Sequence, residues 1–167
     1  MTIKTVYNIS DLVYNYHSDR KGAKYEYLDT LTNEYRFGNA GDIYEVALAW
    51  SKGLPAHKDP NGSYDTGSDL EEYGTSVKSW KFTLATIKAG SFEETLDIYW
   101  KNVKSWNWSF GWIEHDDTLI EYNMNADEFN AFLYRFCKYD KSSKAVRGPA
   151  FSIKKRIEIE NWFEGAS

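Results

Sequence analysis

Asp69, Ser76 and Lys78 are the residues whose types and spacing point most directly to chemistry. They lie on either side of a turn at Gly74. Residues 75–87 combine large apolar side chains with three threonines, which is the composition of a strand, so we expect Asp69 on a neighbouring antiparallel strand. Because side chains alternate along a strand, Ser76 and Lys78 share one face, and Asp69 joins them where the register allows. Such a pairing of aspartate and lysine is what metal-dependent phosphodiester hydrolysis requires.

This hairpin resembles the half-motif of the PD-(D/E)xK nuclease superfamily, which includes many restriction endonucleases. In that family an aspartate and a D/E-x-K triplet occupy neighbouring strands, and the triplet here is Ser76-Val77-Lys78. The resemblance covers roughly residues 41–113 and implies a restriction endonuclease-like α/β (α+β) fold, with a mixed central sheet flanked by helices on both faces. Serine takes the place of the triplet's acid, so a second carboxylate must come from elsewhere.

Two parts of the chain offer that carboxylate. Glu45 lies in a predicted helix that precedes the hairpin and resembles the superfamily's first helix with its metal-facing glutamate. Glu93 and Glu94 lie fifteen and sixteen residues after Lys78, at the start of the next predicted helix, and some restriction endonucleases with serine in the triplet recruit a glutamate from that helix. Glu94 also completes a capping-box pattern with Ser91, which leaves Glu93 the freer of the two.

The resemblance implies a mechanism in which Asp69 and one glutamate hold Mg²⁺ or Mn²⁺. Such an ion polarises the scissile phosphate and lowers the pKa of bound water from about 15.7 toward neutrality. Lys78 would orient that water and offset charge in the transition state, and Ser76 would hydrogen-bond a metal-bound water. Asp65 is a secondary ligand candidate. The alternative is that these polar side chains of the hairpin are simply solvated.

Length and composition predict a single domain over residues 1–167 with a substantial core. The one cysteine, Cys137, leaves no internal disulfide and favours a reducing cytoplasm. No segment approaches the roughly 18 apolar residues of a membrane span, and the N-terminus lacks the apolar stretch of a signal peptide. We therefore expect a cytoplasmic protein with no membrane partner.

The net charge of −5 is unevenly distributed. Between Lys138 and Arg156 seven basic residues face one acid, Asp140, which gives +6 there and leaves −11 for the rest. This basic segment, within a C-terminal helical part at about 126–167, is a candidate phosphate-binding surface, although a solvated loop and helix face is the simpler interpretation. The nucleic-acid-binding candidates are Lys141, Lys144, Arg147, Lys154, Lys155 and Arg156.

Periodicity and capping signals predict the surrounding elements. The predicted helices are 9–16, 42–52, 91–104, one that opens at Asn125 with Phe129, Phe132, Leu133 and Phe136 in the core, and 152–164 with Ile153, Ile157 and Phe163 packed inward. The other predicted strands are 106–113 and 118–124.

Three functions fit these features. The first is an Mg²⁺-dependent nuclease that cuts DNA, of restriction, phage or plasmid type; because many enzymes of this type cut as dimers, the resemblance also admits a homodimer. The second is an inactive protein on the same fold that binds a partner, for example a phage or plasmid inhibitor of a nucleic-acid-guided host nuclease, such as an anti-CRISPR protein. The third is a DNA-binding protein that uses the basic segment without a metal.

Overall fold

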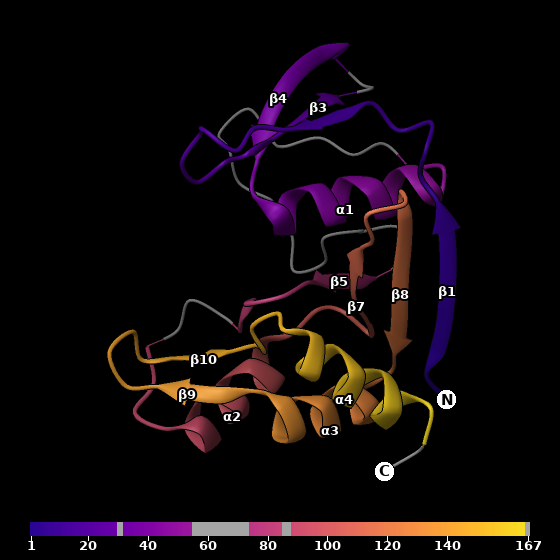
Figure 1. Cartoon of the computed structure of the whole chain (residues 1–167). Coiled ribbons are helices and arrows are strands. Elements are labelled where there is room, and N and C mark those ends of the chain that lie inside the picture. The colour runs from indigo at the N-terminus through magenta and orange to yellow at the C-terminus, as the bar shows by residue number, and fades with distance from the viewer. Residues whose placement is uncertain (30–31, 55–73, 85–87, 166–167) are drawn as a thin grey trace.

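The computed structural model describes residues 1–29, 32–54, 74–84 and 88–165 (Figure 1). Within them the chain forms four helices and ten strands arranged in three sheets, a mixed α/β architecture. The strands are β1 (Ile3–Asn8), β2 (Tyr14–Tyr16), β3 (Tyr25–Asp29), β4 (Glu34–Gly38), β5 (Thr75–Lys78), β6 (Thr83–Leu84), β7 (Asn107–Ile113), β8 (Thr118–Met124), β9 (Lys138–Asp140) and β10 (Ala145–Arg147). The helices are α1 (Ala40–Ser51), α2 (Phe92–Asn102), α3 (Ala126–Phe136) and α4 (Ile153–Phe163).

The central sheet has the strand order β1-β8-β7-β5 and is mixed. β8 pairs antiparallel with β1 and with β7, whereas β5 runs parallel to β7. Parallel neighbours need a crossover connection, and here the chain passes through β6 and α2 between β5 and β7. The sequence thus predicted the mixed central sheet correctly.

The two faces of this sheet carry different helices (Figure 1). On one face α1 packs through Tyr44, Ala47 and Leu48 against Leu119 of β8. The other face is covered by α2, α3 and α4 and holds the larger aromatic core, in which the rings of Trp108 and Phe129 stack with centroids 5.4 Å apart. Helices on both faces explain why five consecutive residues of β7, Trp108 to Trp112, are buried.

A second sheet, β2-β3-β4, lies on the far side of α1 from the central sheet (Figure 1). Its Tyr27 packs with Ile43 and Val46 of α1 in a small apolar cluster of its own. The third sheet, β6-β10-β9, sits beside α2 and places the β9–β10 hairpin inside the C-terminal part that the sequence predicted as helical.

The helix starts follow the capping signals closely. Asn125 accepts a hydrogen bond from Glu128 N at 2.9 Å, and Glu128 Oε1 accepts one from Asn125 N at 3.0 Å, so the predicted capping box of α3 is complete. At α2 only half of the box forms: Ser91 Oγ accepts from Glu94 N, but the Glu94 carboxylate accepts from Gly90 N. The stripe of α3 that was predicted to be core is buried throughout.

Three further sequence-based assignments were wrong. Residues 9–16 form no helix: a single turn, with Leu12 N donating to Ile9 O at 3.0 Å, leads into β2, because the tyrosines of β2 pair with β3 instead. Ile9 and Leu12 are both buried although they belong to no helix.

The strand predicted to begin at residue 75 is interrupted within residues 75–84. β5 ends at Lys78, the chain turns through Lys81 with a φ of 60°, and β6 joins a different sheet by pairing with β10. The Ser79 hydroxyl stabilises the bend by donating to Gly111 O at 2.8 Å.

In α4 the apolar residues that are buried differ from those predicted to be buried. Ile153 and Ile157 are 74 % and 53 % exposed, whereas Ile159 is fully buried and Phe163 stacks on Tyr122. Trp162 and Phe163 fix the rotation of the helix through the aromatic core, which turns the earlier isoleucines outward. None of the four helices is long and apolar enough to cross a membrane, a finding restricted to the described ranges.

Candidate functional site

Ser76 and Lys78 share one face of β5, as the sequence predicted. In the register with β7, Ser76 lies beside Trp108 and Lys78 beside Phe110, both of which belong to the large aromatic core. The Lys78 ammonium lies 5.9 Å from the centroid of the Phe82 ring. Ser76 and Lys78 therefore point to the face of the sheet that α2 and α3 cover.

The alternate residues of β5 point the other way, toward α1. Thr75 Oγ1 accepts a hydrogen bond from Asn107 Nδ2 at 3.2 Å, and Val77 packs against the cluster that contains Tyr44. Glu45 lies in α1 and is half-buried. The structure thus places the helix that carries Glu45 on the opposite face of the sheet from Ser76 and Lys78.

α2 lies on the same face as Lys78, because its Leu96 is part of the same aromatic core. The two glutamates at its start are exposed and already engaged in hydrogen bonds: Glu93 Oε2 accepts from the Tyr134 hydroxyl at 2.7 Å, and Glu94 Oε2 accepts from Gly90 N at 3.0 Å. Of the two carboxylate sources considered from the sequence, α2 shares the face of the lysine and α1 does not.

Asp69 and Asp65 fall outside the described residues, so their distances to Lys78 are not part of the structure. Among the residues that are described, no three histidine, cysteine or acidic side chains gather closely enough to hold a metal ion. The described donor groups alone do not fit Mg²⁺, which takes oxygen ligands in near-octahedral geometry.

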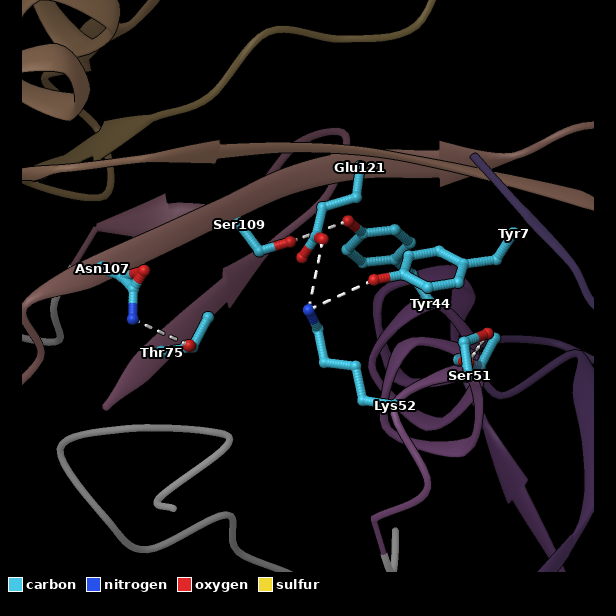
Figure 2. Close-up of polar contacts among 9 residues, drawn as sticks. Tyr7, Tyr44, Ser51, Lys52, Thr75, Asn107, Ser109 and Glu121 are labelled. Atoms are coloured by element: carbon cyan, nitrogen blue, oxygen red, sulfur yellow. Dashed lines mark hydrogen bonds and ion pairs between the residues drawn. The ribbon is translucent and has the colours of Figure 1, made fainter. Parts of the chain in front are cut away.

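A buried polar cluster on the α1 face was not found from the sequence (Figure 2). Glu121, in the middle of β8, is 1 % exposed, and its Oε1 lies 3.3 Å from the ammonium of Lys52. Lys52 follows the last turn of α1 and also donates to the Tyr7 hydroxyl at 3.3 Å. Burial alone would lower the pKa of Lys52, but the Glu121 charge and the Tyr7 hydroxyl raise it above its ordinary value.

The second half of this cluster surrounds the same carboxylate. The Tyr44 hydroxyl and Ser109 Oγ are 3.0 Å apart, and complete burial together with the nearby Glu121 charge raises the pKa of Tyr44 well above its usual range. Gly111 faces Glu121 across the β7–β8 pair, and a Cβ at Gly111 would lie 2.6 Å from the Tyr44 hydroxyl oxygen. Glycine at this position is what allows the α1 hydroxyl to approach the sheet.

A signal for this cluster was present in the sequence. Glu121 lies between apolar neighbours, Ile120 and Tyr122, and a charge at a position with buried neighbours requires a partner. The sequence did not identify Lys52 as that partner. Lys52 and Glu121 are 69 residues apart in the chain, and only the fold brings them together.

The basic segment divides into paired and unpaired cations. Three of its members form ion pairs: Arg147 with Asp140, Lys155 with Glu158, and Arg156 with both Glu114 and Glu160. Lys141, Lys144 and Lys154 make no ion pair with any residue in the described part of the chain. The surface available to phosphates is therefore smaller than the sequence count suggested.

No protein-family model, curated protein or solved structure matches this chain. The chemistry of the site is therefore argued from its own geometry. Ser76 and Lys78 place a buried hydroxyl and an ammonium group on one face of the sheet, and Lys52 forms its ion pair with Glu121 on the other face.

Proposed function

We propose that this protein is a divalent-metal-dependent nuclease that hydrolyses DNA phosphodiesters on a restriction endonuclease-like fold. One observation carries the proposal: Ser76 and Lys78 lie together on the face of β5 that α2 also occupies. In members of this superfamily with serine in the triplet, the second acid would come from the helix that follows the lysine strand, which here is α2. The geometry favours Glu93 or Glu94 over Glu45 as the second acid.

The connectivity around the lysine strand supports the same fold. α1 precedes β5, and α2 follows it and leads into β7, which pairs parallel to β5. This is the order that the resemblance implies, with one helix before the lysine strand and a second after it. A parallel pair joined through a helix holds the lysine strand rigidly, because both of its faces are packed.

The proposed roles follow from side-chain chemistry. Asp69 and one carboxylate of α2 would hold Mg²⁺ or Mn²⁺, which when bound polarises a phosphate and lowers the pKa of its water. Lys78 would donate to the scissile phosphate or the attacking water and offset negative charge there. Ser76, at 6 % exposure, would keep a hydroxyl fixed beside it without adding charge.

Cleavage assays with matched variants test the proposal. Purified protein would be incubated with supercoiled plasmid, linear duplex and single-stranded DNA in Mg²⁺ or Mn²⁺. We expect Asp69→Ala and Lys78→Ala each to abolish metal-dependent cleavage while the thermal unfolding midpoint changes little. Cleavage by both variants at the wild-type rate would rule out this site.

The same assay distinguishes the glutamates. Glu93→Gln or Glu94→Gln is expected to lower the cleavage rate at least about a hundredfold, whereas Glu45→Gln is expected to leave the rate within about threefold of wild type. Tyr134→Phe is the control for Glu93, because it removes the 2.7 Å hydrogen bond and keeps the carboxylate. Loss of activity in Glu45→Gln alone would reassign the second acid to α1.

A non-catalytic binding protein on the same fold is the second candidate. It is favoured by the absence of a three-ligand group among residues 1–29, 32–54, 74–84 and 88–165, and by the net charge of −5. Such a protein would inhibit a partner such as a host defence nuclease through an acidic surface. Absence of cleavage under every condition, together with inhibition of such a nuclease that Asp69→Ala leaves unchanged, would establish it.

A further inference from the structure

The outer face of the β2-β3-β4 sheet carries exposed aromatic side chains. Tyr27 of β3 is fully buried against α1, so alternation directs its neighbours, Glu26 and Leu28, to the opposite face. In the register with β4, Phe37 lies beside Glu26 and Tyr35 beside Leu28. Tyr35 and Phe37 are 57 % and 36 % exposed, and this register places them on the face of the sheet opposite to Tyr27.

Planar groups gather around Phe37. The guanidinium carbon of Arg20 lies 3.8 Å from the centroid of the Phe37 ring, and Arg20 Nε donates to Ala23 O at 2.9 Å, which holds the side chain in place. The His17 ring lies 5.8 Å from the same centroid. A guanidinium plane over an aromatic ring is a surface on which further flat groups stack.

The turn next to this face is basic. Residues 17–24 contain Arg20, Lys21 and Lys24 against Asp19, a net charge of +2 in a protein whose total is −5. Glu26, an acid on the outer face beside Phe37, is engaged by His17, with Oε1 and Nε2 3.2 Å apart. Aromatic platforms beside a cationic turn complement a polyanion that carries flat bases.

We propose that this face binds an unpaired DNA strand, with bases stacked on Tyr35 and on the Arg20–Phe37 pair and phosphates near Lys21 and Lys24. Two residues of one strand lie about 7 Å apart, so the rings would receive two splayed bases rather than bases at the 3.4 Å spacing of a duplex strand. Stacking on a sheet face needs bases that are free of pairing, which excludes intact duplex. This inference depends on the proposed nuclease function only for the choice of DNA as the polymer that binds.

Fluorescence anisotropy of a labelled oligo(dT) strand with the full-length protein tests the inference in a chelating buffer, where no cleavage occurs. We expect Tyr35→Leu and Phe37→Leu each to weaken binding about fivefold or more, since stacking of one base contributes about 1–3 kcal/mol. Leucine keeps apolar area on the face and removes only the ring. Arg20→Lys, which keeps the charge and loses the plane, is expected to weaken binding about threefold.

Phe151→Ala is the matched control, because Phe151 is 55 % exposed and precedes α4 on the other side of the molecule. Its affinity for oligo(dT) should equal that of wild type. Unchanged affinity in the Tyr35→Leu, Phe37→Leu double variant, or no binding of the strand by wild type, would overturn the inference. Asp69→Ala should still bind oligo(dT), so a failed cleavage assay would leave this result standing and would count only against the nuclease.

Discussion

Two ion pairs among the described residues contain a carboxylate that is almost fully buried, Lys52–Glu121 and Arg36–Asp29. Glu121 is 1 % exposed while its partner keeps 20 % of its side-chain surface, so the lysine reaches the solvent and the carboxylate does not. Replacing the lysine of a buried ion pair with an uncharged residue leaves the carboxylate charge uncompensated in the core. The asymmetry predicts that the two residues will tolerate substitution differently.

We expect Lys52→Met to lower the free energy of unfolding by about 3 kcal/mol, because the Glu121 carboxylate then stays buried without a cation. Urea denaturation followed by tryptophan fluorescence measures this change. Lys88→Met, at an exposed lysine, should change stability by less than about 0.5 kcal/mol. The double variant Lys52→Met, Glu121→Leu should recover most of the loss, and equal instability of the single and double variants would show that the charge is not the cause.

Cys137 gives a second prediction for a single residue. Burial raises the pKa of its thiol to about 12, so at pH 8 the folded protein holds almost no thiolate. We expect a disulfide reagent to modify native protein at least about a hundredfold more slowly than protein in 6 M guanidinium. Because the folded pKa is raised, the neutral thiol contributes stability that is lost as the pH rises from about 9 toward 12. Equal reaction rates in the two solutions would contradict this burial.

The element that depends most clearly on one local signal is α3. Its complete capping box ties the first turn to Asn125, and Glu128 also accepts a hydrogen bond from the Thr2 hydroxyl at 2.7 Å. We expect Asn125→Ala to cost about 1 kcal/mol of stability by thermal denaturation, since it leaves the Glu128 amide without its acceptor. Asn102→Ala, at the exposed end of α2, should cost under about 0.5 kcal/mol. A larger loss at Asn102 than at Asn125 would show that capping does not control α3.

Elements with strong local signals were predicted well. The capped helices α1, α2 and α3 and the alternating strands β7 and β8 appear within a few residues of their expected bounds. The failures have a common physical origin in pairing between distant segments. β2 is a strand because its backbone hydrogen-bonds to β3. β5 is shorter than predicted because the chain turns at Lys81 and the next strand, β6, pairs with β10.

The candidate site shows the same division. That Ser76 and Lys78 share a face followed from alternation within one strand. Which helix covers that face did not follow, because it depends on the register of β5 with β7, two elements separated by β6 and α2. The Glu121 cluster was missed for the related reason that its members come from β1, α1, β7 and β8.

At the scale of the whole molecule, the central sheet separates two chemically distinct sides (Figure 1). One side holds α1, the Lys52–Glu121 pair and the small sheet with its exposed aromatic face. The other holds Lys78, α2 and the basic segment around β9, β10 and α4. Any phosphate contact by the basic segment therefore occurs on the same side as the proposed catalytic lysine.

The distribution of ion pairs predicts how the basic segment contributes to duplex binding. Lys141, Lys144 and Lys154 make no ion pair within the described residues, so each is available to a phosphate, whereas Arg156 is held by Glu114 and Glu160. We expect the triple variant Lys141→Gln, Lys144→Gln, Lys154→Gln to reduce the slope of log K against log salt by about 2 to 3, since each phosphate contact contributes about 0.9. Anisotropy titrations of labelled duplex between about 50 and 200 mM salt measure that slope.

Arg156→Gln is the control. It should leave the slope near the wild-type value and lower the unfolding midpoint instead, because Glu114 and Glu160 lose their cation. A triple variant with the wild-type slope would mean that these lysines are only solvated, and that duplex DNA is held elsewhere on the protein.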